Sequence, residues 1–461
     1  MQHFDLCVIG SGSGNTVVTE EFRDARVAIV DGAPWFGGTC LNAGCIPSKM
    51  LAYPADVAEA ARHASVLGVD VTGVLVRWAD LQARVLGRID AASAAGEQRR
   101  ERHENVTVFR DRARFVGPHR LLVGTEEFTA DRFVIAAGSR PWVPDLPGLD
   151  DPAVAARVHT SDDIMRLPQL PRSLLILGGG AVAAEFAHIF AACGTAVTLL
   201  HRGQRLLRDA DEEVSERFTD LLSRRVTLRL GHSFDQVEAT AGGVIVGTVD
   251  DDGVEYFFEA ERVLLALGRV PNGDTLDLAA TGVDVAEDGR IVVDATQRTT
   301  AEGIWALGDV SSPYLLRHVA NHEARVVRHN LLHPDQPVES DHRFVPQAVF
   351  SGPQVAWVGA TEQSLRALGR QYVTATRRYG EVAYGWAMVD TDHFVKLLAD
   401  PADGRLLGAH VIGPEAADLL QPLTQAMSFG LDARTMARGQ YWIHPALSEV
   451  VENALLDLPL P

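Results

Sequence analysis

Two segments of the chain share one pattern: a short apolar run, a cluster of glycines, and then a run of helix-forming residues. The first begins Leu6-Cys-Val-Ile-Gly-Ser-Gly-Ser-Gly14, and the second Ser173-Leu-Leu-Ile-Leu-Gly-Gly-Gly180. A short apolar run bounded by glycine predicts a buried strand, followed here by a tight turn into a helix. In each segment another predicted strand ends about 20 residues after the glycines, at Asp31 and at His201. The pattern therefore predicts two strand–turn–helix units.

The glycine spacing of both units is that of a dinucleotide-binding turn. Glycines let the backbone approach a pyrophosphate, and the N-terminus of the following helix faces its charge. One such match is a weak signal, but two in one chain, each after a strand, are a strong one. Asn15 occupies the third fingerprint position of the first unit, where Gly or Ala is usual. The candidate cofactor-binding residues of the turns are Gly10, Gly12, Ser13, Gly14, Gly178, Gly180 and Ala183.

The ends of the second strands predict different nucleotides for the two units. Asp31 can accept the ribose hydroxyls of an adenosine, although Gly32 and Pro34 beyond it also fit a simple turn. The strand that ends at His201 has no acid there; Arg202 follows directly, and Arg208 lies close behind. Arginines bind a 2′-phosphate through bidentate hydrogen bonds, which favours NADPH over NADH. The alternative is that Arg202 and Arg205 only solvate a surface loop.

The rest of the pattern predicts an α/β fold with two Rossmann-like dinucleotide-binding domains and a C-terminal α+β dimerisation domain. Helical runs cover 55–64 and 79–102, and a proline-rich connection around 141–152 enters the second unit. After Pro334 and Pro337 the pattern changes to mixed strands and helices. We expect an FAD-binding domain at 1–145 and 270–340, an NADPH-binding domain at 146–269, and a dimerisation domain at 341–461.

Composition and charge restrict the class of protein. Hydrophobic residues make up 46% and charged residues 22% of the chain, which is typical of a soluble globular protein. The net charge of −19 argues against nucleic-acid and membrane partners. With no secretion signal and four cysteines, the sequence favours a cytoplasmic, reducing location.

Cys40 and Cys45 lie in Gly37-Gly-Thr-Cys-Leu-Asn-Ala-Gly-Cys-Ile-Pro-Ser-Lys49. On a regular helix an i,i+5 pair points to diverging faces, so a bridge between them requires an irregular turn, which Gly44 permits. A short bridge in a bent turn is easily reduced, and this favours a catalytic disulfide. The alternatives are two inert thiols, or zinc, for which the remaining cysteines Cys7 and Cys193 stand alone. We expect no metal site.

Together these residues resemble the flavoprotein disulfide reductases over nearly the whole chain. The resemblance rests on the cysteine segment, Ala137-Gly138, Gly178 to Glu185, Leu267-Gly-Arg-Val-Pro-Asn272, Ala306-Leu-Gly-Asp309 and Ile443-His-Pro-Ala-Leu-Ser-Glu449. It implies FAD on the first unit, NADPH on the second, and a small-molecule disulfide as substrate. Further cofactor contacts that it implies are Gly38, Thr39, Lys49, Ala113, Gly138, Gly268, Arg269 and Asp309.

The resemblance also assigns catalytic roles. Cys45 would be the thiol beside the flavin, and Cys40 the thiol that attacks the substrate. Lys49 and Glu185 would form an ion pair by the flavin ring. His444, oriented by Glu449, would protonate the leaving thiolate. In this family that histidine serves the other subunit, which implies a homodimer with shared active sites.

Departures from the family pattern leave alternatives open. Glu20 lies where glutathione-reducing members have an arginine for a substrate carboxylate, so its charge disfavours glutathione disulfide. The alternative is that Glu20 is only a solvated helix charge. Ala181 replaces the usual tyrosine over the nicotinamide pocket. The competing functions are three. The first is a lipoamide dehydrogenase, which uses the same redox site to reduce NAD+. The others are a flavin-binding redox sensor and a transhydrogenase or oxidase on the same fold.

Overall fold

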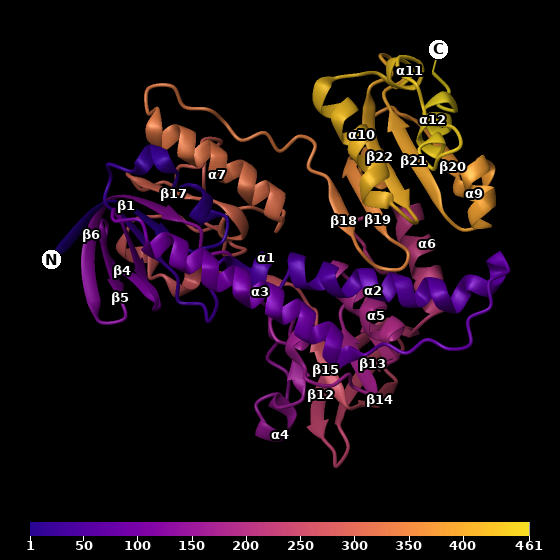
Figure 1. The fold of residues 1–461 in the computed structure, drawn as a ribbon, viewed down its shortest axis with the longest axis horizontal. Coiled ribbons are helices and arrows are strands. Elements are labelled where there is room, and N and C mark those ends of the chain that lie inside the picture. Colours follow the sequence, from indigo (N-terminus) through magenta and orange to yellow (C-terminus); the bar gives the residue numbers. More distant parts are fainter. Residues whose placement is uncertain (461) are drawn as a thin grey trace.

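Three larger sheets, each formed by its own part of the chain, organise the fold (Figure 1). The structure is a computed structural model and describes residues 1–460. The first sheet has the order β3 (Val106–Phe109), β2 (Val27–Val30), β1 (Gln2–Ile9), β6 (Glu126–Ile135), β5 (Arg120–Val123), β4 (Ala113–Gly117), with β17 (Ile304–Ala306) beside β6. β1 runs parallel to both β2 and β6, and apolar residues fill both faces of this central strand.

The second sheet is parallel, and the third is antiparallel. The second has the order β11 (Thr227–Leu230), β10 (Ala196–His201), β9 (Ser173–Leu177), β15 (Arg262–Leu265), β8 (Val158–His159), with a smaller sheet of β12 (His232–Ala239), β13 (Val244–Asp250) and β14 (Glu255–Ala260). The third has the order β18 (Gln347–Val349), β19 (Val355–Gly359), β22 (Leu406–Ile412), β21 (Phe394–Ala399), β20 (Val373–Arg378). These sheets confirm the predicted fold class. The helices of the third part are α8 (Glu362–Ala367), α9 (Ala383–Met388), α10 (Ala416–Phe429), α11 (Ala433–Arg438) and α12 (Glu449–Leu456).

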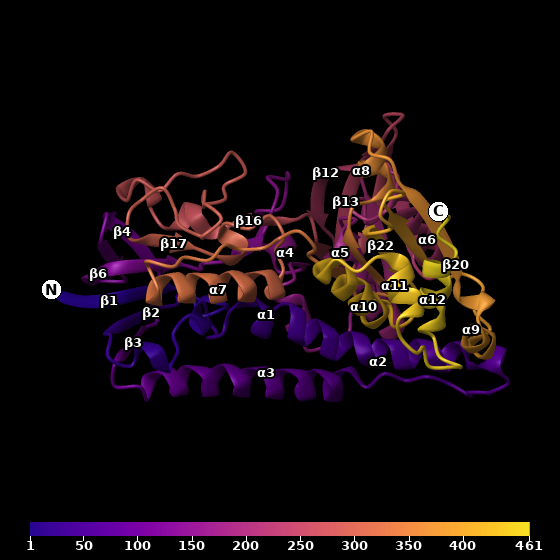
Figure 2. The same cartoon turned by 90° about the horizontal axis from the view of Figure 1, so that it is seen from above.

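Two long helices cross between the sheets. α2 (Cys45–His63) packs on α5 (Ala181–Cys193) of the second unit, and α3 (Trp78–Glu101) lies along α2 (Figure 2). α5 is apolar on nearly all sides because it is buried between its own sheet and α2. The remaining helices are the short α1 (Gly38–Asn42) and α4 (Pro152–Ala155), then α6 (Glu212–Ser223) and α7 (Arg317–Leu332). No helix within residues 1–460 has the length and apolar character needed to cross a membrane.

The sequence predicts a helix directly after the first glycine turn, and this prediction is wrong. The chain instead forms two short 3-10 turns, Gly14–Thr16 and Glu20–Phe22. The β-branched run Thr16 to Thr19 disfavours a helix. Arg100 of α3 also holds this segment open: it donates to the carbonyl oxygens of Asn15 at 2.5 Å and Val18 at 2.9 Å, and to the Asn15 side chain at 2.6 Å. A tertiary contact therefore replaces the helical hydrogen bonds.

A buried ion cluster joins the second sheet to the third. Lys396 of β21 is 3% exposed and reaches Asp211 at 2.8 Å, Glu362 at 2.5 Å and Glu213 at 3.2 Å. Asp211 is fully buried and also caps α6 by accepting from the Glu213 N–H. A buried charge is tolerated only when it is paired, so each partner depends on the other.

Replacing Lys396 by methionine is expected to lower the free energy of unfolding by about 3–5 kcal/mol, because it leaves buried carboxylates without a cation. Denaturant unfolding followed by circular dichroism measures this change. The matched control is Arg366→Met, which removes a 56%-exposed partner of the same Glu362 at 2.7 Å and should cost less than about 1 kcal/mol. Equal effects of the two substitutions would contradict the prediction.

Candidate redox active site

The cysteine segment forms two helices separated by a sharp break. Gly37 and Gly38 have φ of 107° and 74°, a backbone that only glycine adopts readily, and they lead into α1, which carries Cys40. Asn42 closes this turn by donating to the carbonyl oxygens of Phe36 and Gly38. The chain then breaks at Gly44, and α2 begins at Cys45. The break confirms the irregular turn that the spacing of Cys40 and Cys45 predicted.

Cys40 and Cys45 are free thiols that hydrogen-bond to each other. The hydrogen bond from Cys40 lowers the pKa of Cys45 to about 7; burial opposes this, and the positive charges of Lys49 and Arg317 assist it. The same hydrogen bond, together with burial, raises the pKa of Cys40 far above its ordinary value. Cys45 is also the first residue of a long helix, whose N-terminal dipole favours an anion. Cys45 is therefore the thiol that ionises first, while Cys40 stays protonated.

In the reduced protein we expect a thiolate to form with a midpoint near pH 7 and to belong to Cys45. Its ultraviolet absorbance should rise as pH increases through that value, and Cys45→Ser should remove the step. Cys40→Ala should move the midpoint upward, because the largest influence on this pKa is the hydrogen bond from Cys40. A midpoint that stays near 7 without Cys40 would show that this hydrogen bond does not determine it.

The predicted ion pair between Lys49 and Glu185 is confirmed. Lys49 Nζ lies 2.7 and 2.8 Å from the two carboxylate oxygens of Glu185. One of these oxygens also accepts from the Phe350 N–H at 3.0 Å, and the Phe350 ring centroid lies 4.9 Å from Lys49 Nζ. The pair thus joins α2, α5 and the loop before β19 one helical turn from Cys45.

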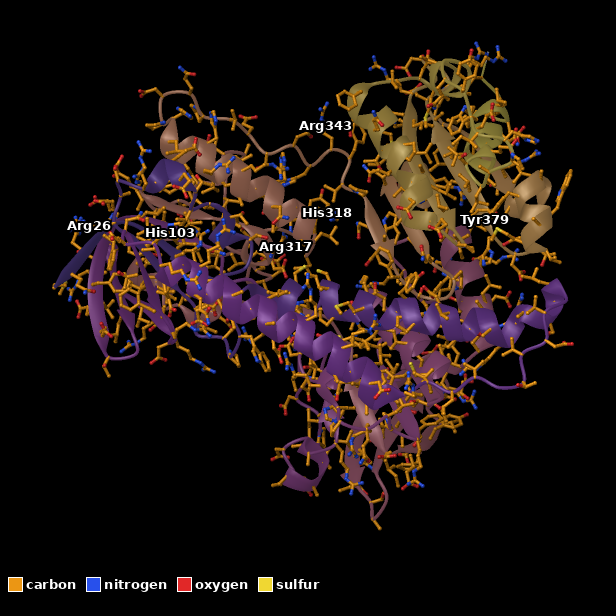
Figure 3. All side chains as sticks on the ribbon, viewed as in Figure 1. Arg26, His103, Arg317, His318, Arg343 and Tyr379 are labelled. Carbon is orange, nitrogen blue, oxygen red and sulfur yellow. The ribbon has the colours of Figure 1, made fainter. Side chains whose placement is uncertain are left out.

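Sequence reasoning missed Arg317, the first residue of α7. Figure 3 shows it at the end of α7 that faces α1. Its charge lowers the pKa of both Cys40 and Cys45, and its Nη1 lies 3.9 Å from the position that a Cβ on Gly12 would occupy. The next turn of α7 also faces this region, because the Ser13 hydroxyl donates to Asn321 Oδ1 at 3.0 Å. No sequence motif marks a cation that only the fold brings to the cysteines.

The first glycine turn lies directly against the cysteine segment. A Cβ on Gly38 would come within 2.6 Å of the Gly12 Cα, so the two backbones touch. A Cβ on Gly10 would lie 2.2 Å from the Ala136 carbonyl oxygen, and one on Gly14 would lie 2.5 Å from the Ala136 Cβ. These close approaches explain why glycine occupies the three positions.

Asp31 supports this turn from the end of β2. It accepts hydrogen bonds from the Ser11 N–H at 3.0 Å and from the Ser11 hydroxyl, and its other oxygen accepts from the Ala33 N–H at 2.8 Å. These contacts are those of the alternative interpretation, in which Asp31 forms a turn; its contact with a ribose stays a prediction. Ser11, which the sequence did not single out, continues the chain of hydrogen bonds by accepting from the Gly37 N–H at 2.6 Å.

Asp309 and Arg269 meet at Ser139. Ser139 Oγ donates to Asp309 Oδ2 at 2.6 Å, while Arg269 donates to the Ser139 hydroxyl and carbonyl oxygens, each at 2.7 Å. These residues lie where β7 (Ser139–Pro141) and β16 (Arg269–Pro271) pair as the chain passes between the first two sheets. Gly138 and Gly268 flank them with positive φ, and a Cβ on either would meet nothing within 4 Å.

The second glycine turn has the predicted strand–turn–helix form. A Cβ on Gly178 would lie 2.2 Å from the Ala266 carbonyl oxygen, whereas one on Gly180 would face open space. Ala183 is buried in α5. Arg202 and Arg208 are exposed at the end of β10. Arg205 instead pairs with Glu212 and Glu216 of α6, so the surface-loop alternative holds for Arg205.

His444 and Glu449 pair with each other but lie apart from the cysteines. The His444 Nδ1 is 2.7 Å from Glu449 Oε1, and this hydrogen bond lowers the pKa of Glu449. The His444 side chain is 71% exposed. Both Figure 1 and Figure 2 show α12, which begins at Glu449, well separated from α1. Within one chain the imidazole and the thiols do not form one site.

Three other predicted residues have different surroundings. Glu20 is exposed in the second 3-10 turn, which fits the alternative of a solvated charge; its charge opposes the effect of burial and of Arg99, which lower the pKa of Arg100. Ala113 begins β4 at the edge of the first sheet. Thr39 is exposed on α1, between Gly38 and Cys40.

Comparison with protein families and curated proteins gives one consistent result. Residues 4–324 match the family model of the pyridine nucleotide-disulphide oxidoreductases, and residues 345–455 match its dimerisation domain. The chain is 51% identical to a mycothione reductase of Mycobacterium tuberculosis, over 99% of this chain and 100% of that protein. It is 33% identical to a glutathione reductase of Burkholderia cepacia, over 97% of each chain. It is 32% identical to a dihydrolipoyl dehydrogenase of Halobacterium salinarum, over 98% of this chain and 95% of that protein.

The structure matches the HOCl-induced flavoprotein disulfide reductase of Escherichia coli. The TM-score is 0.86 at 27% identity, and the match covers 98% of this chain and 99% of that one. The likeness therefore extends over all three sheets and the helices between them.

Proposed function

The chain belongs to the pyridine nucleotide-disulphide oxidoreductase family, and on that basis we propose that it reduces mycothione, the disulfide of mycothiol, with NADPH as the reductant. It is an oxidoreductase, and its cofactors are FAD and NADPH. The observation that carries the proposal is the pair of free cysteines, in which Cys45 at the start of α2 hydrogen-bonds to Cys40 on α1.

The two thiols divide the reduction between them. His444 accepts the Cys40 proton as the Cys40 sulfur attacks one sulfur of the substrate disulfide; the S–S bond breaks, and a mixed disulfide and the first leaving thiolate form. The Cys45 thiolate then attacks Cys40, which forms the Cys40–Cys45 disulfide and releases the second thiol. His444 passes the proton it took from Cys40 to the first leaving thiolate, the second leaving thiolate takes its proton from solvent, and Glu449 fixes the ring. When bound, FAD would supply the transfer of two electrons from NADPH to the Cys40–Cys45 disulfide, which would restore the two thiols.

The residues around the first glycine turn fit FAD. Gly12, Gly38 and Gly138 keep the backbone free of side chains, and Asp309 is held by Ser139 at the end of β17. Lys49, paired with Glu185, supplies a fixed cation near the cysteines. We assign FAD to residues 1–145 and 270–340, and NADPH to residues 146–269, where Gly180 faces open space and Arg202 and Arg208 suit a 2′-phosphate.

We propose a homodimer in which each site takes its histidine from the other chain. Residues 345–455 match a dimerisation domain. The exposed side of the His444 segment also carries apolar side chains that suit an interface: Tyr441 is fully exposed and Ile443 is 74% exposed. The partner subunit's His444 would then reach Cys40.

Mycothione is proposed over other disulfides because the chain is 51% identical to the mycothione reductase of Mycobacterium tuberculosis, against 33% to the glutathione reductase and 32% to the dihydrolipoyl dehydrogenase. Mycothiol, an acetylcysteinyl glucosamine–inositol, carries hydroxyls and no carboxylate. Glu20 can accept hydrogen bonds from hydroxyls, whereas it repels the carboxylates of glutathione disulfide.

The test is NADPH consumption by the purified holoenzyme with mycothione, glutathione disulfide and lipoamide, each repeated with NADH. We expect the highest kcat/KM with NADPH and mycothione. If lipoamide with NADH is preferred, the redox site stands, but the assignments of Arg202, Arg208 and Glu20 are wrong.

Replacing Glu20 by glutamine tests the substrate contact separately. Loss of the charge should raise kcat/KM for glutathione disulfide by about tenfold, because one unfavourable charge pair is removed. The KM for mycothione should rise a few-fold as a charged acceptor is lost. The matched control is Glu21→Gln on the neighbouring exposed residue, which should change neither value. Unchanged values for both substrates in Glu20→Gln would remove Glu20 from the substrate site.

A further inference from the structure

The two glycine turns place the same strand position opposite the cofactor. In the first unit Ile9 pairs with Val30, and the Gly10 N–H donates to the Val30 carbonyl at 2.7 Å. In the second unit Leu177 pairs with Leu200, and the Gly178 N–H donates to the Leu200 carbonyl at 3.0 Å. The residue that follows each carbonyl is therefore equivalent. It is Asp31 in the first unit and His201 in the second.

Each of these side chains contacts the middle residue of its glycine turn. Asp31 accepts from the Ser11 N–H, between Gly10 and Gly12. The His201 ring lies against Gly179, between Gly178 and Gly180: a Cβ at position 179 would come within 2.7 Å of Cγ, Nδ1 and Cδ2 of the ring. On its other side, Nε2 lies 2.7 Å from the position of a Cβ on Gly203. Glycine at 179 and 203 thus makes room for the imidazole.

The surroundings of His201 are suited to a bound anion. Burial, and then the charges of Arg202 and Arg208, lower the pKa of His201, so the free imidazole is neutral at pH 7. Gly179, Gly203 and Leu230, which lies opposite on β11, carry no charge. The ring hydrogen-bonds with the Arg205 backbone, and the Arg205 side chain is neutralised by Glu212 and Glu216. Among residues 1–460 the ion pairs of this loop are those of Arg205 with Glu212 and Glu216 and of Arg208 with Asp209, the last at 3.7 Å between two exposed side chains; none involves His201 or Arg202.

We propose that His201 is a specificity residue of the NADPH site: it occupies the position of the ribose-binding acid and takes up a proton when the 2′-phosphate binds. The inference rests on the proposed function through its NADPH assignment. A 2′-phosphate dianion between Arg202 and Arg208 cancels the two charges that keep the imidazole neutral. The imidazolium then donates a charge-assisted hydrogen bond to the phosphate. Binding of this phosphate therefore consumes a proton, and binding of a nucleotide without it does not.

Calorimetric titration of the holoenzyme with adenosine 2′,5′-bisphosphate tests the inference without turnover. Between about pH 8 and about pH 6.5 the Kd should fall by roughly fivefold, since one linked proton allows at most about tenfold per pH unit. Repeating the titration in buffers of different ionisation enthalpy should show proton uptake. The control ligand, adenosine 5′-monophosphate, should show neither effect.

The variant His201→Gln keeps the size and a hydrogen-bond donor but cannot titrate. Both protein forms share the ionisation of the phosphate itself, so the difference between them isolates His201. We expect less than about twofold change of Kd with pH in the variant, and reduced proton uptake. His201→Glu should weaken bisphosphate binding further, because a carboxylate repels the phosphate.

The outcomes separate the two hypotheses. Equal pH dependence in the wild type and in His201→Gln, with the bisphosphate still preferred over the monophosphate, overturns the role of His201 and leaves the NADPH assignment intact. No preference for the bisphosphate in the wild type overturns the NADPH assignment itself.

Discussion

Replacing Cys40 by alanine is expected to abolish disulfide reduction, with a loss on the order of 10⁴-fold or more, because the nucleophile of the reaction is removed. Cys40 hydrogen-bonds to Cys45, which is the contact that the proposed route requires. Cys45→Ser should give a similar loss, since the mixed disulfide then has no second thiolate to resolve it. The measurement is NADPH-dependent thiol formation from the disulfide substrate.

A second assay distinguishes this chemistry from the transhydrogenase alternative. Electron transfer from NADPH to a quinone or a pyridine nucleotide analogue does not need the thiols, so both variants should retain it within a few-fold. The matched control is Cys193→Ala: burial raises the pKa of this thiol to about 11, so it stays protonated, and the substitution should leave both activities unchanged. Substantial disulfide reduction by Cys40→Ala would fit a reaction that bypasses the pair and would contradict the proposed route.

Local features of the sequence are sufficient to predict most of the fold and the turn that carries Cys40 and Cys45. The spacing of Cys40 and Cys45 with Gly44 between them predicts a break in the helix, and such a break depends only on neighbouring residues. The glycine turns after β1 and β9 are equally local, because a close approach of two backbones excludes any side chain. The pairing of Lys49 with Glu185 was inferred from family resemblance, since nothing in the sequence itself brings the two residues together.

The features that the sequence does not predict are contacts between residues far apart in the chain. Arg100 replaces the helix after Gly14 by binding carbonyl oxygens of another segment, and nothing within that segment indicates this. Arg317 approaches the cysteines because α7 begins opposite α1. His201 was visible in the sequence as the end of a strand, but its equivalence to Asp31 depends on strand register. The pattern of apolar and polar residues predicts helices and strands well. The side chains that reach a site from other helices and strands can be identified only in the folded structure.

A mixed dimer is expected to show which chain supplies the proton donor. His444→Gln alone should lower turnover by about 10²–10⁴-fold, as loss of a general acid does. In a dimer purified with two different tags, one chain carries Cys40→Ala and the other His444→Gln. If the histidine comes from the partner, one site has the intact Cys40 of one chain and the intact His444 of the other, and about half of the wild-type activity remains.

The reciprocal dimer reverses the expected outcome and serves as the control. When one chain carries both substitutions and the other is wild type, each shared site lacks either its nucleophile or its acid, so activity should be near zero. If each chain instead supplied its own histidine, this second dimer would keep about half of the activity and the first would keep almost none. The exposure of His444 and its separation from α1 within one chain are the reasons to expect the first result. Because both dimers contain the same substitutions in the same number, a difference between them cannot come from stability and reports only the geometry of the site.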